Sequence, residues 1–547
     1  MNYLRLLLTL TCLVAFVTST SAYAGDAGTV IRNIEKNTLD NPTEFTKSDQ
    51  PLGLSLDAID VLSGLNVKSD VLNKEIRLYW KAKTGRKITK SDVERFKSWA
   101  WSKFKAKGYL AWLTVDEQVT QDRVTLNIEV TTPKLGQVDV DYSKVTLATK
   151  AQSKIDAGVR KKFKTDDGID VLAMDNHIQN ASFGLPIEFD ARLKQVAPGI
   201  TDLTISARPV EAKPGKVQNA FIQFNNYGLK QYGREQLLAS LTFAGLTPLS
   251  QLSLAAQVSE GVNYGRAEYQ SPISFLGGVS RIYASYADFS SALKSTTATR
   301  GESYEYGVGI THLLGLSRYN AYKSHFDLSE RLTRSELKLG STELTDLRSL
   351  QGRFSLSVDN SKVDMDQYDA SMTLVGGEYQ NSVANQIAGA YSKLELNGRY
   401  VLSLSQDRSV LLASRFRGQY AGTNLDSFDR ISIGGINGIR AYTSVDGIGD
   451  TGAVLTFDLI QKLPYQQYVG MFYDAGVVKP FKNAAAGVAN ESYSLQGAGI
   501  QYGLSYKRAS INLNYAKALG SYHGYVDGNV ESEPHNWRGN ISVTLAF

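Results

Sequence analysis

The chain ends in the stretch GNISVTLAF, residues 539–547, in which every second side chain from Ile541 onward is apolar. A β-strand sends successive side chains to opposite faces of its sheet, so this strand has one apolar face and one small, polar face. That division is typical of a membrane barrel with lipid outside and a wet lumen inside. The terminal aromatic residue, Phe547, also suits recognition by the machinery that assembles such barrels.

The same alternation recurs after residue 216, for example at 237–243 and 511–515. About 330 residues shared among 16 strands leave roughly 21 for each strand and its connection, which fits strands of about 10 residues. We therefore predict a transmembrane β-barrel of 16 strands over residues 213–547, although about 14 or 18 strands satisfy the same arithmetic. A soluble β-sandwich is the alternative, but it would have shorter spacing between turns.

A signal peptide is predicted at residues 1–24. Arg5 precedes an apolar run at 6–17, and the Ala-Tyr-Ala triplet at 22–24 fits the cleavage rule. The run is shorter than the roughly 20 residues that a membrane helix needs. Cys12, the only cysteine, lies inside this run and not at its end, where a lipoprotein would carry it. The mature chain then has no cysteine, which excludes disulfides and thiolate metal sites.

Residues 25–56 form a polar lead, with a helix predicted at 27–38 and a linker at 42–51. An isolated helix of this length is marginal in water. The alternatives are a disordered tail and a docked helix, and a docked helix would be placed to plug the pore at rest.

Two small α/β domains are predicted next, at 57–132 and 133–212. In the first, one helix is indicated by the spacing of Leu72, Ile76 and Trp80, and a second helix by a capping box from Ser91 to Glu94. Strands are predicted to follow at 110–117 and 123–130. The second domain repeats this rhythm without repeating the sequence, with a strand at 137–141, helices at 148–163 and 170–181, and strands at 187–193 and 203–209.

The stretch GGINGIRAY, residues 434–442, is the candidate functional motif, and a second Gly/Asp cluster follows at 446–452. Such a glycine-rich segment between barrel strands is predicted to fold into the lumen, around 434–452. Its single arginine then requires an acidic partner on the wall, because a carboxylate can bind a guanidinium through two hydrogen bonds. The predicted motif residues are Gly434, Gly435, Gly438, Ile439, Arg440, Ala441 and Tyr442.

No pattern in the sequence indicates catalysis, a cofactor or a metal. The five histidines are scattered, and the glycine-rich stretch lacks the Lys-Ser/Thr ending of a phosphate loop. Asp364, Asp366 and Asp369 lack the glycine and distal glutamate of a calcium loop. The formal charge of +5 is small for 547 residues, and nucleic acid is not an expected partner of an exported chain.

Several motifs, in this order along the chain, resemble the outer-membrane transporters of two-partner secretion, the haemolysin-activator type. These transporters carry polypeptide-transport-associated (POTRA) domains ahead of a barrel. TGRKITKSDVERFKSWAWSKFKAKGY at 84–109 resembles a first POTRA domain, and FNNYGLKQYGREQLLASL at 224–241 resembles the opening barrel strands. ISIGGINGIRAY at 431–442 and GDTG at 449–452 resemble the lumenal loop, and FYDAG at 472–476 resembles an adjacent inward-facing strand.

The resemblance implies that Asp474 is the wall partner of Arg440 and that Gly476 completes the strand motif. The loop of the family usually reads Val-Arg-Gly-Tyr, whereas this chain has alanine, Ala441, at the glycine position. Glycine permits backbone angles that alanine resists, so the geometry of the loop tip is where this chain departs from the family.

The resemblance also implies a function. The chain would be an outer-membrane translocator whose two periplasmic domains capture an unfolded exoprotein with an N-terminal secretion domain, which then passes through the barrel. The implied partners are this exoprotein, the barrel-assembly machinery and outer-membrane lipid. An adhesin, a haemolysin and a contact-dependent toxin remain open as the client. An assembly factor of the same superfamily is the nearest alternative, and a diffusion porin or a barrel enzyme is more distant.

Overall fold

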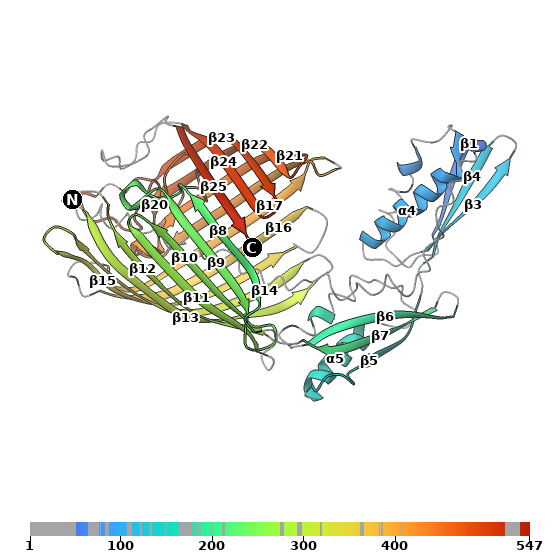
Figure 1. Cartoon of the computed structure of the whole chain (residues 1–547), viewed down its shortest axis with the longest axis horizontal. Coiled ribbons are helices and arrows are strands. Elements are labelled where there is room, and N and C mark those ends of the chain that lie inside the picture. Colours follow the sequence, from blue (N-terminus) through green and yellow to red (C-terminus); the bar gives the residue numbers. More distant parts are fainter. Residues whose placement is uncertain are drawn as a thin grey trace. The chain divides into compact units, whose positions relative to one another are not determined.

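The computed structural model divides the chain into two units, and each is described by itself (Figure 1). One unit holds the described residues up to Val210 with Leu316 and Ser317, and the other holds the barrel. The predicted signal peptide, the helix at 27–38 and most of the predicted linker lie outside the described residues. The structure describes 51–547 except for 64–75, 77, 82–86, 107–111, 121–122, 132–133, 148, 163–177, 181–182, 184, 186, 198–199, 211–213, 274–277, 293–297, 318–319, 361–365, 382, 384–386, 406, 489 and 520–536.

The first α/β domain is built on a four-stranded sheet in the order β2-β1-β4-β3. β1 (Pro51–Ser63) runs parallel to β4 (Arg123–Thr131), and β4 pairs antiparallel with β3 (Trp112–Thr120). β1 therefore begins inside the segment that the sequence analysis assigns to the polar lead. Its backbone pairs on one side with β4 and on the other with β2 (Lys87–Thr89), and these partners are distant in sequence. The buried side chains of this domain include Ile76, Trp80, Val93, Phe96, Leu126 and Ile128.

Helix α4 (Lys90–Ala106) starts one residue before the predicted position, and its capping box uses different residues. The Thr89 hydroxyl accepts a hydrogen bond from the Asp92 amide at 3.2 Å, and the Asp92 carboxylate accepts one from the Thr89 amide at 2.9 Å. Glu94 instead forms an ion pair with Lys97. The predicted box from Ser91 to Glu94 was therefore wrong, because Thr89 ends β2 and presents its hydroxyl to the first helical turn.

The second α/β domain has a three-stranded sheet in the order β5-β7-β6 and the helix α5 (Thr149–Lys162). β5 (Lys134–Asp141) runs parallel to β7 (Ile200–Pro209), which pairs antiparallel with β6 (Ile187–Ala197). One core cluster joins side chains of the helix, such as Ile155, with side chains of the sheet, such as Phe189 and Ile205. The pairing repeats the parallel-then-antiparallel order of the first domain. Most of the predicted helix at 170–181 lies outside the described residues.

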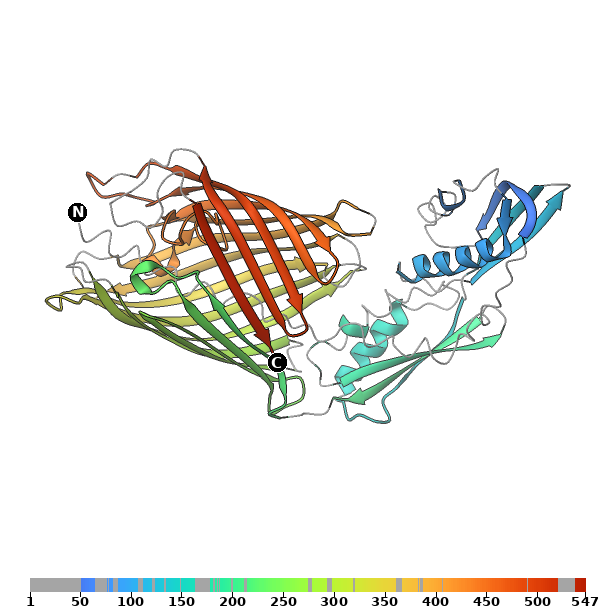
Figure 2. The ribbon, with the colours of Figure 1, turned by 45° about the horizontal axis from the view of Figure 1, so that its top comes forward.

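None of the helices in the described ranges has the length and apolar character required to cross a membrane. The second unit is a closed barrel of sixteen antiparallel strands, which confirms the predicted fold class and strand number (Figures 1 and 2). Its strands are β8 (Val217–Asn225), β9 (Gln236–Ala244), β10 (Gln251–Ser259), β11 (Val262–Ile273), β12 (Gly278–Ser290), β13 (Thr299–Leu316), β14 (Ala321–Leu337), β15 (Glu343–Asp359), β16 (Gln367–Asn381), β17 (Gly389–Ser403), β18 (Val410–Ala421), β21 (Thr451–Leu463), β22 (Gln467–Lys479), β23 (Tyr493–Tyr506), β24 (Ala509–Leu519) and β25 (Trp537–Ala546).

The two faces of the barrel wall differ as the alternating pattern predicts. On β25, Val543 and Leu545 are exposed, whereas Asn540 and Ser542, which point to the other face, are buried. The ring closes where β25 pairs with β8, from Ser542 opposite Asn225 to Ala546 opposite Phe221. Phe547 lies just past this seam with its side chain exposed, and its amide donates a hydrogen bond to the Ala220 carbonyl at 2.9 Å.

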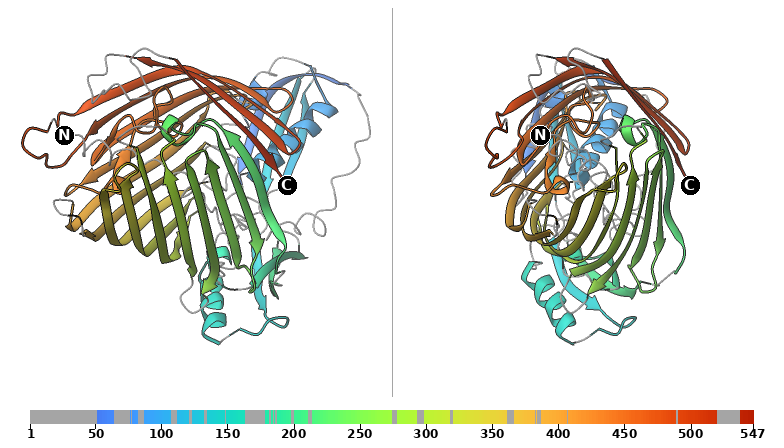
Figure 3. Two further views of the ribbon diagram at one scale, coloured as in Figure 1. Left: turned by 60° about the vertical axis from the view of Figure 1, so that its left-hand side comes forward. Right: turned by 90° about the vertical axis from the view of Figure 1, so that its left-hand side faces the viewer.

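Residues 422–450, between β18 and β21, form what we call the lumenal segment. It contains a short 3-10 helix, η3 (Ser427–Asp429), and the two-residue strands β19 (Ile431–Ser432) and β20 (Ile448–Gly449), which pair with each other. Its side chains contact buried polar side chains of β14, β17, β21 and β22, so the segment lies inside the ring of strands (Figure 3).

Candidate functional site

The backbone of the GGINGIRAY motif is folded tightly on itself. Gly434 forms an isolated β-bridge with Ile439, and the Ile439 amide donates to the Ile433 carbonyl at 2.8 Å. A Cβ atom on Gly434 would lie 2.1 Å from the Thr443 carbonyl oxygen, and one on Gly438 would lie 2.1 Å from the Ile433 carbonyl oxygen. The two glycines are therefore required because backbone fills the space that a side chain would occupy.

This fold directs the Arg440 side chain into the barrel wall, where it meets two carboxylates. Its Nε donates to Asp474 Oδ2 at 2.9 Å and its Nη2 donates to Asp474 Oδ1 at 2.7 Å, a bidentate pair. Its Nη1 donates to Asp458 Oδ1 at 2.7 Å. The Arg440 backbone amide also donates to Asp474 Oδ2 at 3.0 Å. Both the position and the orientation of the guanidinium are thereby fixed.

The register of β21 and β22 explains this pocket. Asp474 and Phe472 are two residues apart on β22 and therefore face the same side, and Asp458 lies opposite Phe472 on β21. The guanidinium carbon lies 3.6 Å from the centre of the Phe472 ring, which is a cation–π contact. The carboxylates bind the nitrogens at the edge of the guanidinium. Only 4% of the Arg440 side chain and none of the Asp474 side chain is exposed, so water screens the pair weakly.

Two further contacts hold the tip of the lumenal segment. The Asn540 side-chain amide donates to the Arg440 carbonyl at 3.2 Å and to Asn514 Oδ1 at 2.7 Å, which ties the tip to β25 and β24. Gly476 lies against the side chains of Ile433 and Ile439, each 3.2 Å from where its Cβ would be. Glycine on β22 therefore leaves room for the apolar residues of the motif.

Ala441 does not strain the loop. Among the described non-glycine residues, those with positive φ do not include Ala441, so this position does not need the backbone freedom of glycine. Its methyl group instead lies 2.8 Å from where a Cβ on Gly497 would be, and it is buried. The neighbouring Tyr442 is fully buried, and its carbonyl accepts a hydrogen bond from the Gly435 amide at 3.1 Å.

The Arg440 guanidinium remains a cation despite its burial. Burial by itself lowers the pKa of Arg440, but the hydrogen bonds and charges of Asp474 and Asp458 outweigh burial and raise the pKa above its ordinary value. Both carboxylates also interact electrostatically with Arg415 of β18.

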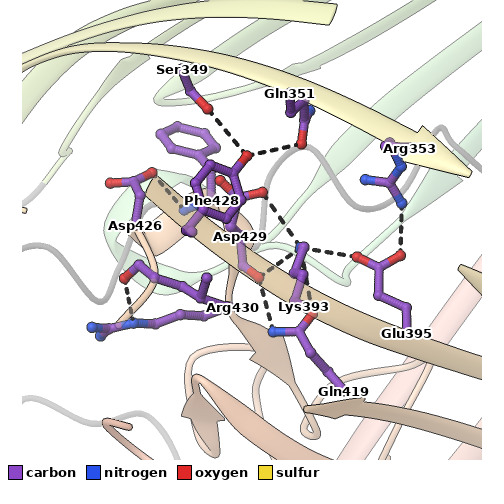
Figure 4. Close-up of polar contacts among 12 residues, drawn as sticks. Ser349, Gln351, Arg353, Lys393, Glu395, Gln419, Asp426, Phe428, Asp429 and Arg430 are labelled. Atoms are coloured by element: carbon purple, nitrogen blue, oxygen red, sulfur yellow. Dashed lines mark hydrogen bonds and ion pairs between the residues drawn. The ribbon is translucent and has the colours of Figure 1, made fainter. Parts of the chain in front are cut away.

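A second group of contacts, on a different part of the wall, was not found from the sequence (Figure 4). Asp429 of η3 accepts hydrogen bonds at Oδ2 from Arg331 Nη2 at 2.6 Å and from the Tyr379 hydroxyl at 2.9 Å. Lys393 Nζ donates to the Asp429 carbonyl at 2.9 Å and lies 3.4 Å from its Oδ1. Asp426 Oδ1 lies 3.5 Å from the same Arg331 nitrogen. All five side chains belong to buried residues.

The wall side of this group is itself held by ion pairs. Glu395 binds Lys393 at 2.9 Å and Arg353 at 2.7 Å (Figure 4). Together with Arg331, Asp426 and Asp429, the cluster holds three carboxylates and three cations. Burial raises the pKa of the Asp429 carboxyl, but the Arg331 and Lys393 charges outweigh it and hold the pKa well below its usual range. Asp429 is therefore ionised at neutral pH.

The two ends of the lumenal segment are also tied together. Arg430 Nε donates to Asp450 Oδ1 at 2.9 Å, and the Leu425 amide donates to the same oxygen at 3.2 Å. Asp450 Oδ2 accepts from the Lys482 amide at 2.8 Å. The two ends of the segment are therefore joined to each other, and we call the contact between Arg430 and Asp450 the base contact.

Several of these partners were missed because the sequence shows them only as ordinary strand residues. Asp458, Arg331 and Lys393 occupy alternating positions in long strands, and nothing local distinguishes them from other lumenal polar residues. Within the described ranges, no cluster of three or more His, Cys, Asp or Glu side chains could hold a metal ion. The geometry is suited to holding a polypeptide segment by ion pairs.

Comparisons with known proteins agree with this architecture. A model of the family of haemolysin secretion/activation proteins ShlB/FhaC/HecB matches residues 206–508. The chain is similar to the haem/haemopexin transporter protein HuxB of Haemophilus influenzae strain Rd, with 21% identity over 502 residues, 86% of this chain and 84% of HuxB. HuxB of strain 86-028NP is 20% identical over 498 residues, with the same coverage of 86% and 84%.

Two solved structures share the fold. CdiB from Escherichia coli superposes with a TM-score of 0.54 at 14% identity and covers 93% of each chain. CdiB from Acinetobacter baumannii has the same TM-score of 0.54 and identity of 14%, covering 93% of this chain and 95% of its own. Since the family match spans more than half of the sequence, the chain belongs to the ShlB/FhaC/HecB family of haemolysin secretion/activation proteins, the outer-membrane transporters of two-partner secretion.

Proposed function

We propose that this transporter passes its partner exoprotein through the barrel only after the lumenal segment has moved, and that Arg440 and Asp474 hold the segment at rest. The observation that carries the proposal is the buried bidentate pair between the segment and the wall, at 2.9 and 2.7 Å. A folded segment inside the ring leaves less room for an extended chain. An ion pair can hold such a segment and still be exchanged for water when the client enters.

The N-terminal part of the chain supports a proposal for client capture. The two small α/β domains would be POTRA domains in the periplasm, as the repeated strand order suggests. In the second of them β6 is an edge strand, which pairs with β7 and lies at one end of the sheet order. An unfolded exoprotein could add a strand to such an edge, with main-chain hydrogen bonds giving affinity without strict sequence demands.

The proposed activity is transport, without catalysis. The remaining partners are the barrel-assembly machinery, which would read the C-terminal Phe547, and outer-membrane lipid around the exposed apolar face. Family membership favours a secretion transporter over an assembly factor of the same superfamily.

Deletion of the gene tests the function. We expect a large exoprotein encoded nearby to disappear from the medium and to accumulate or be degraded in the periplasm, and the wild-type chain to restore its secretion. A strain that secretes all its exoproteins normally without this chain would refute the function. Complementation with Arg440→Gln tests the holding role separately, and wild-type secretion together with an unchanged resting conductance would refute that role.

A further inference from the structure

We propose that the lumenal segment is held by two independent anchors and is released in two steps. The first, which we call the tip anchor, consists of Arg440 with Asp474 and Asp458. The second, the entry anchor, consists of Asp426 and Asp429 with Arg331, Lys393 and Tyr379. This inference rests on the proposed function, because it describes how the same segment is held and moved.

The two anchors bind different parts of the wall. The tip anchor uses β21 and β22, whereas the entry anchor uses β14, β16 and β17. Strands β14 to β17 are consecutive in the ring, and β18 separates them from β21 and β22. The lumenal segment therefore bridges two sectors of the barrel, and the two sets share no residue.

The charges of the two anchors are reversed. At the tip the segment supplies a cation and the wall supplies carboxylates, whereas at the entry the segment supplies carboxylates and the wall supplies cations. A client residue or a local charge that competes for one anchor would therefore not compete in the same way for the other. Opening of an anchor frees its wall charges to bind side chains of the opposite sign on a passing chain.

The entry anchor is built from contacts that do not involve the tip. Asp429 is bound through its side chain by Arg331 and Tyr379 and through its carbonyl by Lys393 and by Gln419 Nε2, the last at 2.9 Å. The base contact joins Arg430, which directly follows the entry anchor in sequence, to Asp450, which follows the tip. Loss of the Arg440 contacts removes none of these bonds, so the tip can withdraw while residues 425–430 stay on the wall. Asp426 and Asp429 are thus positioning residues that fix where the segment hinges.

Single-cysteine labelling tests the independence of the anchors, since the only cysteine, Cys12, lies in the predicted signal peptide. Ser427→Cys reports on the entry anchor and Ala441→Cys on the tip anchor, because both positions are buried at 5% exposure. Each reporter is labelled with a maleimide in whole cells, in the otherwise unchanged full-length chain and in the variants Asp429→Asn, Arg331→Gln and Arg440→Gln.

We expect Asp429→Asn and Arg331→Gln to speed labelling at position 427, and Arg440→Gln to speed labelling at 441. Each increase should be on the order of tenfold or more, the factor that corresponds to about 1.4 kcal/mol. The other reporter should stay protected in each case. The matched control is Asp327→Asn, which breaks a buried wall-to-wall pair with Arg281 at 2.7 Å and should leave both reporters protected.

Joint exposure of both reporters in all three anchor variants, with the control protected, would overturn the two-anchor proposal and indicate a single cooperative unit. Protection of position 427 in Asp429→Asn and Arg331→Gln would also overturn it. Separate labelling together with wild-type secretion and conductance in every variant would instead refute the proposed holding function and leave the two anchors standing. Exposure of both reporters in the control would identify a general loss of barrel stability. The denaturant midpoints of the same variants then decide. Equal decreases of the midpoint in the control and in the anchor variants would overturn the proposal.

Discussion

Removing the cation of the tip anchor should cost more than removing either of its carboxylates. In Arg440→Gln, two buried carboxylates lose the guanidinium to which both are hydrogen-bonded. Asp474→Asn leaves Arg440 paired with Asp458 at 2.7 Å, and Asp458→Asn leaves the bidentate pair with Asp474 intact. The expected order of destabilisation is therefore Arg440→Gln, then Asp474→Asn, then Asp458→Asn.

The magnitudes follow from burial. Arg440 and Asp474 are at most 4% exposed at their side chains, so an orphaned charge there costs about 3–5 kcal/mol. Asp474→Asn removes a charge but keeps an amide that can accept a hydrogen bond, so its cost should be about 1–3 kcal/mol. The Gln501 side-chain amide donates to the Asp458 carboxylate at 2.9 Å. In Asp458→Asn this amide still meets a neutral acceptor, so the substitution should cost about 1 kcal/mol.

Unfolding of the purified barrel in urea, with the three variants compared at one lipid composition, measures these costs. Secretion and resting conductance of the same variants report on the segment itself. A simple charge swap, Arg440→Asp with Asp474→Arg, should rescue only partly, because the new carboxylate at 440 would face Asp458. Adding Asp458→Asn to the swap should improve the rescue. Equal destabilisation by Arg440→Gln and Asp458→Asn, or full rescue by the simple swap, would refute this reading of the pocket.

Three further predictions concern other parts of the chain. The Arg331 and Lys393 charges hold the pKa of Asp429 below its usual range. The stabilising contribution of the Asp429 carboxylate is therefore complete above its unfolded pKa of about 3.9 and is lost as the pH falls through the lower folded pKa. Thermal unfolding should show less acid destabilisation in Asp429→Asn than in the wild type, and identical pH profiles would contradict this prediction. Gly434→Ala should destabilise the segment by about 1–3 kcal/mol, because its Cβ would lie 2.1 Å from a carbonyl oxygen, whereas Gly376→Ala, with nothing within 4 Å, is the matched control; equal unfolding midpoints would count against the backbone argument. Deletion of residues 27–38 should raise channel conductance in planar bilayers if this helix plugs the pore, and unchanged conductance would remove that hypothesis.

Much of the architecture could be predicted because it depends on local periodicity. The alternation in Ile541–Phe547 identifies a membrane strand without any knowledge of its neighbours, and chain length limits the strand number to a narrow range that includes the observed sixteen. Local signals were weaker where partners are distant. β1 was missed as a strand at 51–56 because its pairing with β4 bridges more than sixty residues, and the helix cap was misassigned because Thr89 and Ser91 both satisfy the pattern.

The sequence by itself determined that this chain is a barrel with a glycine-rich segment carrying one arginine, because strand alternation and glycine content are properties of neighbouring residues. The resemblance to a family supplied Asp474 as its partner. Only the tertiary structure decided that Asp458 shares that arginine and that Arg331 and Lys393 hold Asp429. Those contacts depend on strand register around a closed ring, which brings side chains from distant strands to one side of the lumen. No local pattern encodes that register, since every lumenal polar residue in a barrel strand looks alike until its neighbours are placed.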